Sequence, residues 1–193
     1  MRRPLGAALL LLALVPGLRA GTELRLGAWY GPQFVNDAKI NDVYGASQAF
    51  CVLPYVEARF GAGWTLGAAY EAGYNRSGVI GPYQYATSLT LSGFCLLGGY
   101  EYKRNRLAVF AQAGLGLYAY AQTVDNPNVT DMPVDAHHVG AVAAAGIKFY
   151  AADGVFIGAE ARYVALKVQP YDATVDLGGW RLAIGAGIAF AIR

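Results

Sequence analysis

The sequence has little charge, few sulfur-containing residues and, as shown below, no apolar run long enough for a transmembrane helix. Charged residues make up 15% of the 193 residues and hydrophobic residues make up 55%, whereas disordered chains have the opposite balance. The formal net charge is only +2, which argues against a strongly basic nucleic-acid-binding protein. The chain has two Cys, two Met and two His, but 25 Gly and 14 Tyr. This composition indicates a single domain of a membrane-associated class.

The first twenty residues have the pattern of a secretion signal. Arg2 and Arg3 form a positively charged start, residues 6–15 form an apolar core, and Ala20 offers a small residue for cleavage. The apolar core is too short for a transmembrane helix, which needs about 20 residues. We therefore expect residues 1–20 to be removed during export.

The exported chain has two architectures open to it. Its longest later apolar runs, residues 139–147 and 182–192, are too short for a membrane-spanning helix. Inside lipid, only helices and closed barrels satisfy all backbone hydrogen bonds. The chain is therefore either a secreted soluble β-protein or a transmembrane barrel.

Side-chain polarity alternates with a period of two along the mature chain, which is typical of β-strands with two different faces. In the last run, Trp180, Leu182 and Ile184 share one face, and Arg181 lies on the other. In residues 85–102 the pattern changes phase near Gly93, so we expect a β-bulge there. The alternation predicts eight strands near residues 23–31, 50–60, 64–75, 85–102, 106–122, 138–150, 155–168 and 180–192.

The connections between these strands alternate in length. Three are tight turns, at residues 61–63, 103–105 and 151–154, and the longer ones are rich in Asp, Asn, Pro and Gly. Short turns at one end and long loops at the other are typical of outer-membrane barrels. The prediction is an all-β, eight-stranded antiparallel up-and-down transmembrane barrel with both termini on the short-turn side. The predicted extracellular loops are about 34–47, 76–84, 123–137 and 169–176.

Charge placement distinguishes a membrane barrel from a soluble one. Every Glu falls in a predicted strand, on the less apolar face, and every Asp falls in a loop or turn. A soluble ligand-binding barrel would be apolar inside, whereas here the polar face points inward and the apolar face points toward lipid. The predicted lumen charges are Glu23, Arg25, Glu57, Arg59, Glu71, Glu101, Lys148, Glu160, Arg162 and Arg181.

These charges would fill the interior, because an eight-stranded barrel is just wide enough for its own side chains. Unpaired charges there would be costly, so we expect ion pairs. The expected pairs are Glu57 or Glu71 with Arg59, and Glu160 with Arg162 or Lys148. Such a lumen would not conduct through a wide aqueous pore.

Aromatic residues gather near both ends of the predicted strands, as amphipathic rings do at membrane interfaces. Those near the short turns are Phe60, Trp64, Tyr100, Tyr102, Phe149 and Phe190. Those near the long loops are Tyr30, Tyr70, Tyr74, Tyr85, Tyr163 and Trp180.

In strand number, alternation and loop asymmetry, residues 21–193 resemble the eight-stranded OmpA-type and OmpX-type outer-membrane barrels. The resemblance implies an outer-membrane location, a lumen filled by ion pairs, and mobile surface loops. It also implies contact with outer-membrane lipids, and assembly by periplasmic chaperones and the barrel-assembly machinery. Members of this family usually end in an aromatic residue, but here Phe190 is followed by Ala191, Ile192 and Arg193. No appended peptidoglycan-binding domain is expected after the last strand.

The loop at 123–137 is a candidate site for a divalent cation. Carboxylate and amide oxygens are the ligands that Ca²⁺ and Mg²⁺ prefer. Asp and Asn also form turns for local reasons, so both interpretations stay open. The candidate ligands are Asp125, Asn128, Asp131 and Asp135.

Cys51 and Cys95 are the only cysteines, and export permits a disulfide. They are predicted on strands two apart, and strands are spaced at about 4.8 Å. That separation is near or beyond the limit of about 7 Å between bridged Cα atoms. A disulfide and two free thiols both remain open.

Some barrels of this family modify lipid A. The deacylases use Ser and His on the lipid-facing surface, and the last strand here has neither. The acyltransferases use His, Asp and Ser at the extracellular rim. Asp135, His137 and His138 lie near such a rim, with Ser77 and Ser88 elsewhere, but no motif of that family surrounds them.

We therefore interpret the chain as a non-enzymatic barrel with a role in envelope integrity or loop-mediated surface contact. The first alternative is a narrow ion or solute pore, and the second is a lipid-modifying enzyme at the rim. We expect a monomer with no catalytic residues and no nucleic-acid partner. A divalent cation in the loops is the only candidate cofactor.

Overall fold

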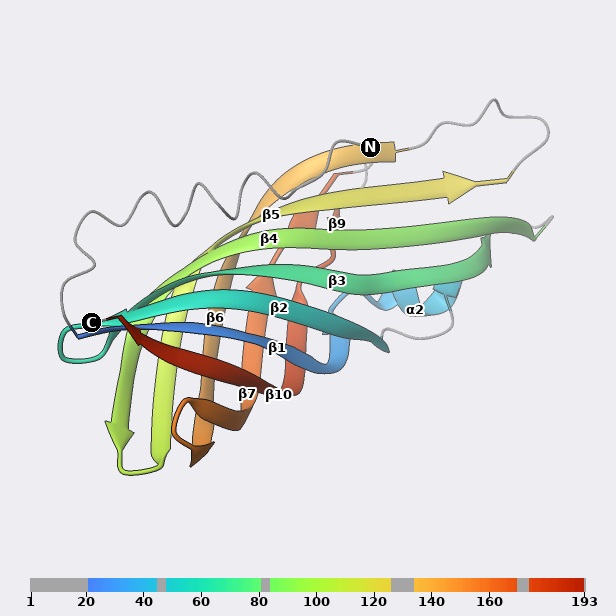
Figure 1. The fold of residues 1–193 in the computed structure, drawn as a ribbon. Coiled ribbons are helices and arrows are strands. Elements are labelled where there is room, and N and C mark those ends of the chain that lie inside the picture. Colours follow the sequence, from blue (N-terminus) through green and yellow to red (C-terminus); the bar gives the residue numbers. More distant parts are fainter. Residues whose placement is uncertain (1–20, 45–47, 81–83, 126–133, 170–173, 193) are drawn as a thin grey trace.

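The strands of the computed structural model close into one antiparallel barrel (Figure 1). Each barrel strand pairs with its neighbours in the chain, and β10 pairs with β1 to close the ring. The predicted eight-stranded up-and-down barrel is therefore confirmed.

The structure describes residues 21–44, 48–80, 84–125, 134–169 and 174–192, so the predicted signal segment lies outside the described residues. In chain order the elements are β1 (Thr22–Val35), α2 (Ala38–Tyr44), β2 (Gln48–Phe60), β3 (Trp64–Ile80), β4 (Tyr85–Arg104), β5 (Leu107–Val124), β6 (Val134–Ala152), β7 (Val155–Ala165), β8 (Lys167–Val168), β9 (Val175–Asp176) and β10 (Gly179–Ile192).

The two ends of the barrel are built differently. The turns between β2 and β3, between β4 and β5, and between β6 and β7 lie at one end, the short-turn end. Helix α2 and the β8–β9 hairpin belong to connections at the other end, the loop end (Figure 1). The loop end is more ordered than the sequence predicts, because the expected loop 34–47 contains α2. The expected strand 155–168 is also interrupted at Leu166, where β7 gives way to β8.

Several strands are longer than a bilayer requires. A strand crosses lipid with about 9–11 residues, but β4 has 20 residues and β6 has 19. Strands β3 to β6 therefore extend past the bilayer at one or both of their ends. The expected loop 76–84 is correspondingly shorter, since β3 continues to Ile80.

The inward face of the barrel becomes apolar where the strands extend past the bilayer. On β4, Thr87, Leu89 and Leu91 are buried inside the barrel, and Ser88 and Thr90 alternate with them on the other face. Where the outside is water rather than lipid, the apolar face must turn inward. The polarity of β4 thus changes because the surroundings of the strand change. Its side chains keep alternating between the same two faces.

The prediction of a β-bulge in β4 near Gly93 therefore named the wrong strand. Strand β4 keeps one phase, and the register shift lies in β3 between Glu71 and Tyr74, opposite Gly93 and Leu91. Gly73 occupies the irregular position with φ of 129°, a conformation that side chains with a Cβ rarely adopt. The extra residue is in the partner strand, at the height where the sequence pattern changed.

An apolar cluster fills the loop half of the barrel. Helix α2 contributes two of its members, Ile40 and Tyr44, which makes the helix an inward-facing cover rather than an exposed loop. The buried members are Val35, Ile40, Tyr44, Ala49, Leu89, Leu91, Cys95, Leu97, Tyr118, Tyr120, Val142, Val164, Leu166, Val168 and Leu177.

Hydrogen bonds fasten α2 over this cluster. The Tyr44 hydroxyl lies 3.2 Å from Thr87 Oγ1 and accepts a hydrogen bond from Gln122 Nε2 at 3.0 Å. At the other side of the loop end, the Asp176 amide donates to Asp37 Oδ2 at 3.1 Å. Helix α2 and the β8–β9 hairpin therefore close the loop end together. Within the described ranges, no helix is both long and apolar enough to cross a membrane.

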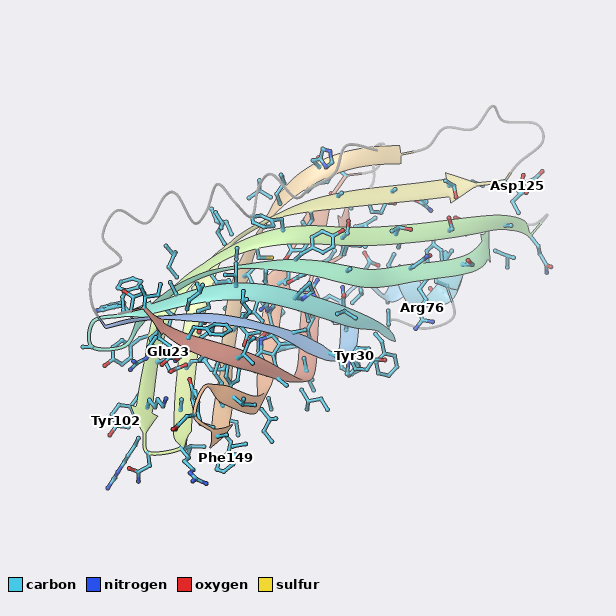
Figure 2. All side chains as sticks on the ribbon, viewed as in Figure 1. Glu23, Tyr30, Arg76, Tyr102, Asp125 and Phe149 are labelled. Carbon is cyan, nitrogen blue, oxygen red and sulfur yellow. The ribbon has the colours of Figure 1, made fainter. Side chains whose placement is uncertain are left out.

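The outer surface of the barrel is apolar. Ile184, Val139 and Leu115 are among the most exposed side chains, at 70%, 67% and 61%. Figure 2 shows Tyr102 and Phe149 at the short-turn end and Asp125 at the opposite end. The predicted girdle residues that are exposed are Tyr30, Phe60, Trp64, Tyr70, Tyr100, Tyr102, Phe149, Trp180 and Phe190. Tyr85 and Tyr163 are half-buried, and the side chain of Tyr74 is not among the described parts.

The fold predicts that two glycines of β4 respond differently to a methyl group. A Cβ on Gly93 would lie 2.4 Å from the buried Tyr118 ring, whereas a Cβ on Gly98 would meet nothing closer than 3.8 Å. We expect Gly93→Ala to lower the free energy of unfolding by about 1–3 kcal/mol through overpacking. Gly98→Ala should change it by less than about 0.5 kcal/mol. Urea unfolding in lipid vesicles measures both, and equal effects would contradict the packing described here.

Candidate functional site

The ten predicted lumen charges all lie on inward faces of the strands, and the structure joins them by ion pairs into two clusters. Each cluster has equal numbers of acidic and basic groups, so each is formally neutral. The turn-side cluster consists of Glu23, Arg25, Glu57, Arg59, Glu101 and Lys148. The central cluster consists of Glu71, Glu160, Arg162 and Arg181.

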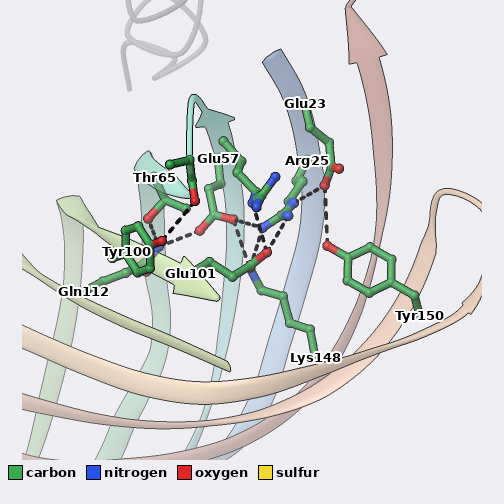
Figure 3. Close-up of polar contacts among 11 residues, drawn as sticks. Glu23, Arg25, Glu57, Thr65, Tyr100, Glu101, Gln112, Lys148 and Tyr150 are labelled. Atoms are coloured by element: carbon green, nitrogen blue, oxygen red, sulfur yellow. Dashed lines mark hydrogen bonds and ion pairs between the residues drawn. The ribbon is translucent and has the colours of Figure 1, made fainter. Parts of the chain in front are cut away.

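Glu101 is the centre of the turn-side cluster (Figure 3). The guanidinium of Arg25 binds it through two bonds, Nη1 to Oε2 at 2.6 Å and Nη2 to Oε1 at 2.7 Å. Lys148 Nζ lies 3.1 Å from Glu101 Oε2 and 2.8 Å from Glu57 Oε1. The side chains of Arg25 and Glu101 are fully buried. Two parallel bonds of this kind fix geometry as well as charge.

Strand register brings these groups together. Arg25 on β1 is directly opposite Glu57 on β2, and Glu23 is directly opposite Arg59. Directly opposed side chains on one face of an antiparallel pair are within contact distance. Glu101 comes from β4, which does not pair with β1, so it reaches Arg25 across the lumen.

Neutral side chains complete the turn-side cluster. Gln112 Nε2 donates to Glu57 Oε2 at 2.5 Å and to Thr65 Oγ1 at 3.1 Å. Lys148 Nζ lies 4.7 Å from the centre of the Phe110 ring, close enough for a cation–π interaction. Gln112 could not be predicted from the sequence, because nothing distinguishes one neutral polar residue in an alternating strand from another.

The central cluster is organised around Glu71. Arg162 Nη1 lies 3.0 Å from Glu71 Oε1, and Arg181 Nη2 lies 2.9 Å from Glu71 Oε2. Arg162 also pairs with Glu160, Nε to Oε1 at 2.8 Å. Two further nitrogens of Arg181, Nε and Nη1, are buried without a hydrogen-bond partner. This cluster is thus neutral in charge but incompletely hydrogen-bonded.

One expected pairing was wrong, and the other is confirmed by the pair of Glu160 with Arg162. Arg59 pairs with Glu101 at 3.4 Å and not with Glu57 or Glu71. Lys148 pairs with Glu57 and Glu101 and not with Glu160, which is bound to Arg162. Pairing across a barrel depends on how far each strand is shifted along its neighbours, and the sequence does not give this shift.

A small cavity lies where the two clusters approach each other. Its volume is about 20 Å³, which is room for about one water molecule. Its lining includes Glu57 and Lys148 from the turn-side cluster and Glu160 and Arg162 from the central cluster. The lumen between the clusters is thus filled almost entirely by side chains.

The disulfide left open by the sequence is not formed. Cys51 and Cys95 are both buried free thiols. Cys95 Sγ lies 3.3 Å from the Tyr118 hydroxyl, and Cys51 Sγ lies 3.4 Å from the Gly31 carbonyl oxygen. Strand β3 lies between their strands, which puts about 9–10 Å between the two backbones. That distance exceeds the limit for a bridge.

The candidate cation ligands are mostly beyond what the structure describes. Asn128 and Asp131 lie outside the described residues, as does the side chain of Asp135. Asp125 is exposed at the end of β5. The described part of the chain contains no group of three or more His, Cys, Asp or Glu side chains that could hold a metal ion. The cation site therefore stays a prediction.

The rim residues considered for catalysis do not converge. His137 on β6 is opposite Ala119 of β5, whereas Ser88 on β4 is opposite Thr123 of the same strand. A whole strand and several residues along it thus separate the histidine from the serine. Ser88 Oγ is instead 2.6 Å from Thr123 Oγ1.

Several solved outer-membrane proteins share this fold. OprG from Pseudomonas aeruginosa matches with a TM-score of 0.62 at 13% identity, covering 91% of this chain and 99% of that chain. Neisserial surface protein A matches with a TM-score of 0.59 at 14% identity, covering 89% and 98%. Ail of Yersinia pestis, solved with the heparin analogue sucrose octasulfate, matches with a TM-score of 0.56 at 15% identity, covering 88% and 99%.

No protein-family model and no curated protein sequence matches the chain. At these identities the structural likeness shows the fold alone. The chain therefore has the fold of an outer-membrane β-barrel, and its apolar exterior and charged lumen suit a protein that spans a bilayer.

Loss of the central carboxylate of the turn-side cluster should be costly. Glu101→Gln leaves Arg25 and Lys148 with excess buried positive charge, so we expect the free energy of unfolding to fall by about 3–5 kcal/mol. The matched control is Glu23→Gln, because Glu23 is 22% exposed and has one ion-pair partner. This control should lose no more than about 1 kcal/mol. Urea unfolding in vesicles compares the two, and similar losses would refute the central role of Glu101.

The thiols offer a direct check of the interior packing. Both Cys51 and Cys95 should resist a maleimide in the folded protein, because both are buried. After denaturation without a reductant, both should react. Mass spectrometry counts the added groups, and an unreactive denatured protein would mean that a disulfide forms after all.

Proposed function

We propose that this chain is an integral outer-membrane protein whose barrel is closed and whose role is structural and surface-directed. The observation that supports this most strongly is that the ten predicted lumen charges are paired in two neutral clusters. The apolar cluster and α2 add a second closure at the loop end. A pore would need an aqueous path through both layers.

The loop end favours cationic partners. The four predicted loops contain seven Asp and only two basic residues, Lys39 and Arg76. Ail was solved with a polyanionic heparin analogue, but an acidic surface repels polyanions. We therefore propose that the loops of this chain bind divalent cations or basic surfaces, with Asp125, Asn128, Asp131 and Asp135 as the candidate cation ligands.

A non-enzymatic role fits the described rim better than lipid modification. The described rim does not bring the Ser88 hydroxyl beside the His137 imidazole. We further propose that the protein works as a monomer among outer-membrane lipids. Its biogenesis would depend on periplasmic chaperones and the barrel-assembly machinery.

Single-channel recording in a planar bilayer tests the closed barrel. We expect no discrete current steps from refolded protein whose folding is verified by heat-modifiable gel mobility. If wild-type protein conducts, two variants show whether the current passes through the lumen. Arg25 is buried in the lumen and Arg104 is exposed, so Arg25→Ala tests a path through the lumen and Arg104→Ala is the control. A current altered only by Arg25→Ala would overturn the proposal and make the clusters part of an ion path.

A further inference from the structure

A polar pocket lies at the short-turn end, between the turn that joins β4 to β5 and the turn that joins β6 to β7. Its volume is about 370 Å³. Lys103, Asn105 and Arg106 line it from the first turn, and Asp153 and Gly154 line it from the second. One wall of the pocket is therefore basic and the other is acidic.

The charges around this pocket do not neutralise one another. The ten lumen charges are joined by ion pairs, but within the described ranges Lys103, Arg106 and Asp153 are in none. Arg106 and Asp153 are also exposed. The pocket therefore offers both signs of charge to a ligand.

Contacts with neighbouring strands hold both walls in place. Lys103 Nζ lies 3.5 Å from the centre of the Tyr150 ring, close enough for a cation–π interaction. The Arg106 carbonyl accepts a hydrogen bond from the Tyr150 amide at 2.8 Å, and the Gly154 carbonyl accepts one from the Ala189 amide at 2.7 Å. Both turns are thus anchored to the barrel.

The pocket also borders the lipid-facing surface. At this end the last directly opposed pair of β5 and β6 is Leu107 with Phe149, and both side chains are exposed, at 49% and 44%. Figure 2 shows Tyr102 and Phe149 at the same end. The lining residue Tyr150 directly follows Phe149 in the chain, so the pocket lies just beyond this pair. Aromatic side chains of this kind mark the level of lipid headgroups.

We propose that this pocket binds the phosphoethanolamine headgroup of a lipid from the leaflet on the short-turn side. Lys103 and Arg106 would bind the phosphate, and the Asp153 carboxylate would accept a hydrogen bond from the primary ammonium. The acyl chains would lie over Leu107 and Phe149. The occupant carries both charges because Asp153 would repel a purely anionic group, and the two basic residues would repel a metal cation.

Native mass spectrometry of the refolded protein in detergent tests this proposal by counting the lipids that stay bound. The probes are phosphatidylethanolamine, phosphatidylcholine and phosphatidylglycerol with identical acyl chains. We expect phosphatidylethanolamine to be retained about fivefold more than either of the others, the effect of one exposed ion pair. The choline group has no N–H to donate to Asp153, and the glycerol group has no positive charge. Equal retention of the three lipids, or a preference for phosphatidylglycerol, would overturn the proposal.

Two substitutions in the pocket have matched controls outside it. Asp153→Asn should abolish the preference for ethanolamine over choline, and Arg106→Gln should lower the retention of phosphatidylethanolamine. The controls are Asp125→Asn at the loop end and Arg104→Gln on the same hairpin, because both residues are exposed and neither lines the pocket. All four variants must show the folded gel mobility, and both controls should keep the wild-type preference. A preference that survives Asp153→Asn, or that is lost equally in the controls, would also overturn the proposal.

A competition experiment separates a lipid from a water-soluble ligand with the same headgroup. Glycerophosphoethanolamine carries the headgroup without acyl chains. It should displace phosphatidylethanolamine only at much higher concentration, because it cannot contact Leu107 and Phe149 through acyl chains. If it competes at equal concentration, the pocket binds a soluble zwitterion and the assignment to a lipid is overturned.

Discussion

The neutralisation of buried charge inside a lipid-surrounded wall is the constraint on which this structure depends. An isolated charge in such an interior costs several kcal/mol, and removal of one partner leaves that cost uncompensated. Here Arg25 and Glu101 come from strands that do not pair, so their contact is made across the lumen. A slip of one residue in any strand would turn its charged face toward lipid. The register therefore brings the ion pairs together, and the ion pairs favour that register over a slipped one.

The same constraint explains why the barrel has two interiors. Within the bilayer, the apolar side chains face lipid and the polar ones pair in the lumen. Toward the loop end of β4 the outside becomes water, and Leu89 and Leu91 turn to the inside while Ser88 and Thr90 take the other face. Helix α2 then covers an apolar interior with Ile40. The polarity of each face follows its surroundings, while the strand itself stays continuous.

This dependence of side-chain polarity on the surroundings also limits how much of the fold could be predicted from the sequence. Alternation was enough to predict eight strands, the closed barrel and the inward face of charges such as Glu57 and Arg162. It failed in β4, where a change of solvent looked like a change of phase, and the irregularity was in β3 at Gly73. The alternation pattern also gave no indication of α2, because it predicted a loop there. The partner of Lys148 depends on the relative shift of strands, a property of the closed ring rather than of any one segment.

The most direct test of this account is a double-mutant cycle between Arg25 and Glu101. The free energy of unfolding would be measured in vesicles for Arg25→Ala, Glu101→Ala and the double variant. If pairing across the lumen specifies the barrel, the double variant should be less damaged than the sum of the two single variants. The expected coupling is about 2–3 kcal/mol. Additive losses would mean that the two groups act independently, and would contradict the central role given to their pairing.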